Sequence, residues 1–147
     1  MIAIIAILAA MLLPALSRAK PEAWDSPGFL YKKLSQMVNP SPSGIWVVLD
    51  EREDSINDGW FAVSMAGAPA LIGGTPTPGS YIIIDFPSSY HNGAAGFGFA
   101  DAHSEIHKWR DPRTTPVLKR GQDLQLRVPS AGNVDVEWIH DHTTGRK

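Results

Sequence analysis

The chain opens with an uncharged hydrophobic run. Residues Met1 to Leu16 include no charged or polar side chain, and the run ends abruptly at Ser17-Arg18-Ala19-Lys20. An α-helix of this length rises roughly 24 Å at about 1.5 Å per residue. That is less than the roughly 30 Å of hydrocarbon in a bilayer. The pattern therefore predicts an N-terminal hydrophobic α-helix, residues 1–23, that lies in a membrane and whose first part precedes Met1.

A secretory signal peptide is the alternative interpretation of this run. Such a peptide has basic residues before its apolar core and a small-residue cleavage site after it. No basic residue precedes the run here, and no small-x-small site stands cleanly between Leu16 and Lys20. The sequence therefore favours an anchor that is retained.

The remainder, residues 24–147, has the pattern of one β-rich head domain. Short β-branched and aromatic runs alternate with segments rich in glycine, proline and serine, which is typical of strands separated by turns. The fold class predicted is α+β, a hydrophobic N-terminal helix followed by a head with an antiparallel sheet. The expected strands are 45–49, 60–65, 81–86, a hairpin of 96–100 and 104–109, and a weaker strand over 134–139 with Val134, Val136 and Trp138 on one face.

Segments between these runs are expected to be irregular. Residues 21–28 join the helix to the head, and residues 39–44 and 66–80 are expected to be loops because they concentrate proline and glycine. Residues 29–38 are compatible with either a short helix or an irregular strand.

Composition narrows the function classes. The net charge is −2 without a basic block, so nucleic acid is not an expected partner. There is no cysteine, which excludes disulfides, thiolate metal ligands and a cysteine nucleophile. No serine stands in a recognisable elbow or triad context. The chain is accordingly not expected to be an enzyme.

An acidic loop after residue 49 is a candidate cation site. Carboxylates and an amide crowd residues 50–58, and Ca²⁺ binds six to eight such oxygen ligands. The spacing is not that of an EF-hand. The candidate calcium ligands are Asp50, Asp54, Asn57 and Asp58, and the alternative is a solvated acidic turn in which these side chains cap backbone groups.

Histidines near the expected hairpin form a second candidate cluster. On a strand, residues 103, 105 and 107 share one face, so His103, Glu105 and His107 could offer two imidazoles and a carboxylate to a transition metal. Histidines on exposed strand faces are common, so a structural role is the favoured interpretation.

The apolar run also carries a family resemblance. Residues Ile2 to Lys20, with the proline at position 14, resemble the inner part of the N-terminal helix of type IV pilin-like proteins and type II secretion pseudopilins. The family's basic leader and the first residues of its mature helix are not in this sequence. The resemblance implies that this helix packs in a membrane or a filament core, through residues that include Ile4, Ile7, Leu8, Met11, Leu12 and Pro14.

A second block, far from the first, resembles the same family. The stretch Tyr90 to His103 is similar to the His-x9-Asp-Gly motif of a large pseudopilin-like group, with His91 and Asp101 as its fixed residues and Ala102 in place of the glycine. The resemblance implies that His91 and Asp101 are a structural pair. If the motif's glycine has a positive φ, Ala102 is strained by about 1 kcal/mol.

Together these blocks imply a function of assembly. The resemblance implies a single-pass subunit of the bacterial inner membrane, with its head on the periplasmic or extracellular side. It is expected to associate with itself and with other pilins or pseudopilins in a type IV pilus-like or type II secretion filament. The alternative is a membrane-tethered extracytoplasmic domain that binds a metal or hydrolyses a substrate through His91, His103 and His107.

Overall fold

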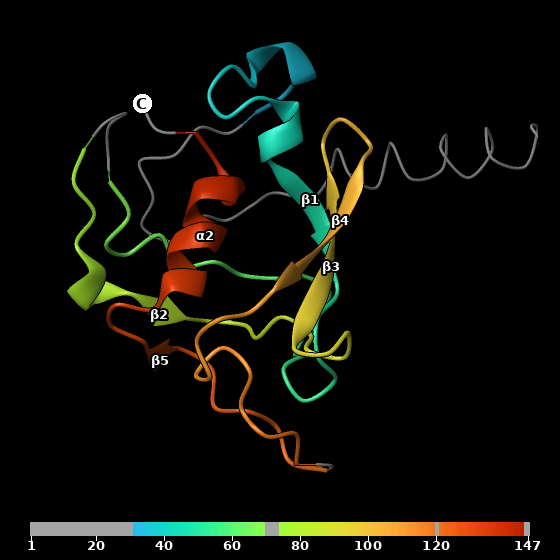
Figure 1. Cartoon of the computed structure of the whole chain (residues 1–147), viewed down its shortest axis with the longest axis vertical. Coiled ribbons are helices and arrows are strands. Elements are labelled where there is room, and N and C mark those ends of the chain that lie inside the picture. Colours follow the sequence, from blue (N-terminus) through green and yellow to red (C-terminus); the bar gives the residue numbers. More distant parts are fainter. Residues whose placement is uncertain (1–30, 70–73, 120, 146–147) are drawn as a thin grey trace, which may run out of the picture.

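A computed structural model describes residues 31–69, 74–119 and 121–145 of the chain. The expected N-terminal helix, residues 1–23, and its packing residues Ile4, Ile7, Leu8, Met11, Leu12 and Pro14 lie outside these ranges, as does the boundary with the head. Within the described part, no helix is long and apolar enough to cross a membrane. What the structure describes is an α+β fold with antiparallel sheets (Figure 1).

The main sheet has three antiparallel strands in the order β1-β3-β4. The central strand β3 (Ala94–Phe99) lies between β1 (Trp46–Leu49) and β4 (Ser104–Lys108). Opposite Gly98 stand Val48 on one side and Ser104 on the other. The expected strand at 45–49 and the hairpin around Asp101 are therefore confirmed.

A smaller sheet pairs β2 (Ile82–Ile83) with β5 (Val128–Pro129), also antiparallel. The strand expected over residues 81–86 is thus confirmed only in its first part. It ends early because the backbone N–H of Phe86 donates to the Ser55 hydroxyl, 2.7 Å away, rather than to a neighbouring strand.

The C-terminal segment is a helix, α2 (Val134–Thr143), so the strand expected over residues 134–139 was wrong. Asn133 decides the conformation, because its side-chain oxygen accepts hydrogen bonds from the backbone N–H groups of Asp135 and Val136. Residues 136, 139 and 140 then lie on one buried face, as the helical period requires. Three 3₁₀ turns complete the described elements: η1 (Leu34–Gln36), η2 (Pro42–Gly44) and η3 (Pro78–Ser80).

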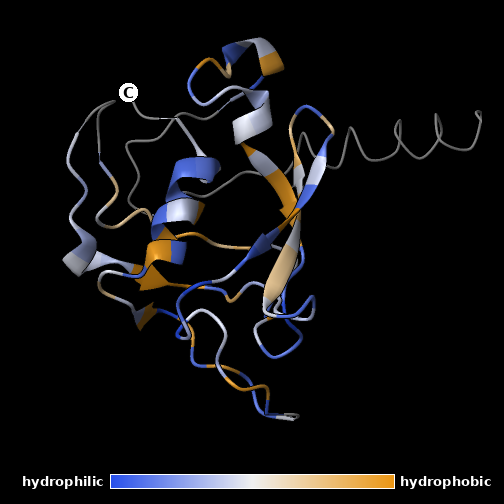
Figure 2. Ribbon diagram, viewed as in Figure 1, coloured by the Kyte–Doolittle hydropathy of each residue, from blue (hydrophilic) through white to orange (hydrophobic). Residues whose placement is uncertain are grey.

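Helix α2 contacts both sheets and forms the core with them (Figure 1). Ile139 packs with Ala95, Phe97, Phe99 and Trp109 against the main sheet. One turn earlier, Val136 packs beside β2 with a second apolar group, Tyr81, Ile83 and Phe86. Figure 2 shows the apolar residues of β2 and β5 continuing into the first turn of α2. The helix therefore holds the two sheets together.

The strand expected over residues 60–65 does not form, although its apolar residues do pack. Phe61 meets Trp46 edge to face with ring centroids 6.0 Å apart, and Val63 packs against the core. The backbone of this segment bonds side chains rather than a neighbouring strand. The N–H of Ala62 donates to Asp85, 2.6 Å away, and the carbonyl of Ser64 bonds the His140 ring. A buried segment needs its polar groups paired, but the partner need not be another strand.

Candidate interaction surface

The two faces of the main sheet carry different residues along the central strand β3. Ala95, Phe97 and Phe99 are buried against the core, while Gly96 and Gly98 alternate with them and face outward. This alternation follows from the two-residue period of a strand. The sheet therefore has an aromatic inner face and an outer face whose central strand lacks side chains.

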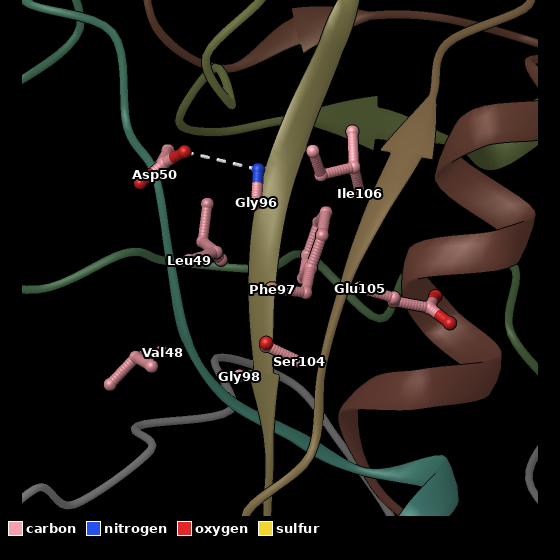
Figure 3. A pocket seen from close by; sticks show the side chains of 9 residues that line it. All are labelled: Val48, Leu49, Asp50, Gly96, Phe97, Gly98, Ser104, Glu105 and Ile106. Carbon is pink, nitrogen blue, oxygen red and sulfur yellow. Dashed lines mark hydrogen bonds between the residues drawn. The ribbon is translucent and has the colours of Figure 1, made fainter. Parts of the chain in front are cut away.

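A groove lies on the glycine side of the sheet (Figure 3). Its volume is about 650 Å³. Val48 of β1 and Ile106 of β4 stand on either side of the glycines, and the two residues are 55% and 65% exposed. The lining residues are Val48, Leu49, Asp50, Gly96, Phe97, Gly98, Ser104, Glu105 and Ile106.

The two glycines keep the floor of the groove at the level of the backbone. A Cβ added at Gly98 would lie 2.8 Å from Cγ2 of Val48, and one added at Gly96 would lie 2.8 Å from Oδ2 of Asp50. That same Asp50 oxygen accepts a hydrogen bond from the Gly96 N–H at 3.1 Å (Figure 3). Any larger residue at either position would have to displace a neighbour, so the groove depends on both glycines.

Polar groups surround the apolar walls. Asp50 and Ser104 line the groove on the same side as the glycines, whereas Val48 and Ile106 present large apolar surfaces to solvent. An apolar centre with a polar rim is the usual composition of a protein–protein contact. Strand β4 is moreover at an edge of the sheet, so its outer backbone groups are not paired within the sheet.

The structure does not bring the predicted calcium ligands together. Asp50 faces the groove, and Asp54 is buried with its carboxylate bonded to Arg52. Asp58 accepts a hydrogen bond from the backbone N–H of Trp60, 2.8 Å away, and Asn57 is exposed. Across the described residues, no group of three or more His, Cys, Asp or Glu side chains could hold a metal ion. The three aspartates therefore have separate partners: Asp50 and Asp58 accept from backbone N–H groups, as the alternative describes, whereas Asp54 pairs with Arg52 in the interior.

Arg52 is the residue of this loop that sequence reasoning missed. Its Nε and Nη2 donate to the two Asp54 oxygens at 2.6 and 2.8 Å, and its Nη1 donates to the carbonyl of Pro116 at 2.6 Å. Its side chain is 1% exposed. The Arg-x-Asp spacing was a usable signal, because a carboxylate close to an arginine is a more probable arginine partner than a cation ligand.

His91 and Asp101 do not contact each other but lie at opposite ends of β3. Nε2 of His91 is 3.3 Å from Oδ2 of Asp50, and both side chains are half exposed. The expected pairing of His91 with Asp101 is thus replaced by a pairing with Asp50. His91 remains next to the groove, because Asp50 also bonds Gly96.

Asp101 closes the β3–β4 turn. Its Oδ1 accepts from the backbone N–H of His103 at 3.1 Å and also bonds Nδ1 of the His103 ring. These hydrogen bonds lower the pKa of Asp101. The His103 ring stacks on Phe99 with centroids 4.4 Å apart. Ala102, at the position of the motif's glycine, has a φ of 74°, so the condition under which it would be strained is met.

His107 belongs to an aromatic stack on the inner face of the sheet. Its ring stacks on Trp138 of α2 with centroids 3.7 Å apart, and His142 stacks near the same indole at 4.2 Å. Burial lowers the pKa of His107, and the neighbouring His142 adds to this effect. His91, His103 and His107 therefore have three separate sets of partners and do not form one site.

No protein-family model matches this chain, and no curated protein or solved structure shows significant similarity to it.

Proposed function

We propose that this chain is a pilin-like or pseudopilin subunit that is anchored in the bacterial inner membrane and assembles with copies of itself. The observation that carries the proposal is the uncharged run from Met1 to Leu16 in front of a β-rich head. The motif from His91 to Asp101 supports it through its resemblance to the same family. The filament is of the type IV pilus or type II secretion kind, and the head faces the periplasm or the exterior.

The physical basis is an exchange of contacts. A helix without polar side chains satisfies its backbone internally and is stable in lipid or against other apolar helices. When such helices pack together, dispersion contacts between Ile and Leu side chains replace contacts with lipid. A subunit of this kind can therefore leave a bilayer only by entering a core made of its own neighbours.

The head contributes a second contact in this proposal. We infer that the groove between Val48 and Ile106 receives an apolar side chain from a neighbouring copy. Support comes from the backbone-level floor at Gly96 and Gly98, and from the exposure of both walls. The filament would bring copies together at high local concentration, so a groove contact too weak to hold two free heads could still form.

The alternative function, a metal-binding or hydrolytic head, lacks a geometric basis in the described residues. Its three histidines have different partners: Asp50 for His91, Asp101 and Phe99 for His103, and Trp138 for His107. No observation favours it over assembly.

Membrane insertion can be tested with charges placed in the apolar run. The chain is expressed in a bacterial host, and its membranes are washed with alkaline carbonate, which releases peripheral proteins. We expect the wild-type chain to stay in the membrane pellet. Replacing Ile7→Lys and Leu8→Lys together should move it to the supernatant, because each lysine near a helix centre costs about 3 kcal/mol of insertion free energy.

The control places the same two charges on the head. Val38→Lys and Val117→Lys alter side chains that are 80% and 81% exposed, so this variant should stay in the pellet like the wild type. Release of the wild-type chain by carbonate would rule out an inserted anchor and with it the proposed function.

A further inference from the structure

Strand β4 forms an open edge of the main sheet. It is the last strand in the order β1-β3-β4, and among the described residues β3 is the only strand that pairs with it. Every residue of β4 except His107 is exposed. The strand has neither a proline nor a bulge, two features that protect sheet edges from pairing. This edge is therefore open to a further strand.

The backbone groups that face outward from β4 follow from its bonds to β3. At the turn end of the hairpin, the N–H of Phe99 donates to the carbonyl of His103, 2.9 Å away. Bonded and non-bonded positions alternate along an antiparallel pair, so residues 103, 105 and 107 bond β3. The N–H and C=O groups of the other three residues therefore point away from the sheet: Ser104, Ile106 and Lys108.

This alternation limits how a second copy of the chain can meet the edge. Two copies related by a two-fold axis perpendicular to the sheet bring their β4 strands together antiparallel. Outward backbone groups must then meet outward backbone groups. Ile106 of one copy accordingly lies opposite Ser104, Ile106 or Lys108 of the other, and registers shifted by one residue are excluded.

Glu105 selects one of these three registers. With Ile106 opposite Ser104, Glu105 lies opposite Glu105 of the second copy, and like charges directly opposite are unfavourable. With Ile106 opposite Lys108, Glu105 lies opposite Trp109, whose indole N–H already donates within the head. Only the register with Ile106 opposite Ile106 gives the Glu105 carboxylate a polar partner.

We propose that two copies of this chain pair through β4 in that register, which joins their main sheets into one. Each Glu105 then faces His107 of the other copy at a position without backbone bonds, where opposite side chains lie closest, and its carboxylate accepts a hydrogen bond from the imidazole. Each Ser104 faces Lys108. The two Ile106 side chains meet at the two-fold axis, which covers a residue that is 65% exposed in the single chain.

The contact is small, and it goes beyond the proposed function without depending on it. A strand of five residues buries less than the roughly 1,200 Å² of a stable interface. The pair is therefore transient unless a shared membrane or micelle holds the copies close together. A two-fold contact also closes on itself. It pairs subunits and does not by itself extend a filament.

Single cysteines test the register, because only a residue at the two-fold axis meets its own counterpart. Full-length chains in detergent micelles are oxidised with copper phenanthroline, and disulfide dimers are measured on non-reducing gels. A disulfide needs Cα atoms about 4.4–6.8 Å apart, and a hydrogen-bonded antiparallel pair provides about 5.5 Å. We expect Ile106→Cys to form dimers several-fold faster than Glu105→Cys. The matched control Val48→Cys, 55% exposed on the other wall of the groove, should be equally slow.

Charges at position 104 provide a second measurement at an exposed site, where the fold tolerates substitution. Ser104→Glu lies opposite Lys108 of the second copy and should raise the dimer fraction in sedimentation several-fold. Ser104→Lys should lower it, and adding Lys108→Glu to Ser104→Lys should restore it.

Equal disulfide rates at positions 48, 105 and 106, or a fastest rate at position 105, would overturn the proposal. So would a dimer fraction that does not respond to the charges at position 104. The apolar helix is the same in every variant, so association through it raises all rates alike. The carbonate wash tests the anchor separately, so a chain that stays in the membrane pellet but shows equal rates would overturn the β4 pairing alone.

Discussion

Two arginine–carboxylate pairs in this chain have the same short spacing but different surroundings. Arg52 binds Asp54 through two hydrogen bonds in the protein interior, with its side chain 1% exposed. Arg113 binds Asp111 with the same two-bond geometry, at 2.9 and 2.6 Å, but its side chain is 48% exposed. The comparison separates the effect of burial from that of geometry.

Removing the buried arginine should be far more damaging than removing the exposed one. Arg52→Ala leaves the Asp54 carboxylate buried without its donor and removes a donor from the partly buried Pro116 carbonyl, so we expect a loss of about 3–5 kcal/mol in the free energy of unfolding. Arg113→Ala should cost much less, because solvent screens that pair. Urea unfolding of both variants measures this, and equal losses would contradict the account of the loop.

The turn between β3 and β4 allows a stabilising change. Ala102 has a φ of 74°, a left-handed conformation that costs an L-residue about 1–2 kcal/mol and glycine very little. Ala102→Gly should therefore raise the free energy of unfolding by about 1 kcal/mol after the added entropy of the unfolded chain is subtracted. Ala100→Gly, two residues earlier and without a positive φ, should lower it instead. A gain from Ala100→Gly equal to that from Ala102→Gly would point to turn flexibility rather than strain.

At the scale of elements, local hydrophobic patterns predicted some strands and failed for others. Residues 45–49 and the hairpin follow the strand pattern, and the structure confirms them. Residues 134–139 alternate like a strand but are helical, because one side chain, Asn133, caps the helix and also donates to Thr114 and Ser130. The strand predicted over residues 60–65 does not form for a related reason: the backbone groups of this segment bond side chains that are distant in sequence, Asp85 and His140.

Strands β1 and β3 lie so close together that the groove needs glycine at position 98, and this requirement can be tested by mutation. Gly98→Ala places a methyl group 2.8 Å from Cγ2 of Val48, and a β-branched side chain has little freedom to move away. We expect a loss of about 1–3 kcal/mol, the usual cost of overpacking. Val48→Ala removes the clashing atom, so the double variant should be more stable than the sum of the two single changes predicts. Simple additivity in this mutant cycle would show that the two residues do not touch.

At the scale of the whole molecule, the sequence indicated an α+β class and an antiparallel sheet. The described residues show both, but the helix among them is the C-terminal α2 and not the N-terminal helix that the prediction named. The sequence could not indicate that α2 packs on both sheets through Val136 and Ile139, because that contact joins residues far apart in the chain. In the candidate sites too, contacts between residues far apart in the chain could not be predicted. The Asp101 turn is local and was predicted, whereas the bonds of Asp50 to Gly96 and His91 are long-range and were not.

Assembly through copies of the chain, with the groove at their contact, is the central claim. It is tested most directly by cross-linking in the membrane. Because the sequence has no cysteine, only an introduced cysteine can react with the cross-linker. Single cysteines are placed at Ile106, on the groove, and at Val117, which is similarly exposed at 81% but lies elsewhere, and the membranes are treated with a short bifunctional maleimide.

The account predicts a covalent dimer for Ile106→Cys and little product for Val117→Cys. The dimer should disappear when Ile7→Lys and Leu8→Lys are added, because subunits outside the membrane no longer meet. Equal dimer yields from the two cysteines, or a dimer yield that survives the loss of the apolar run, would contradict it.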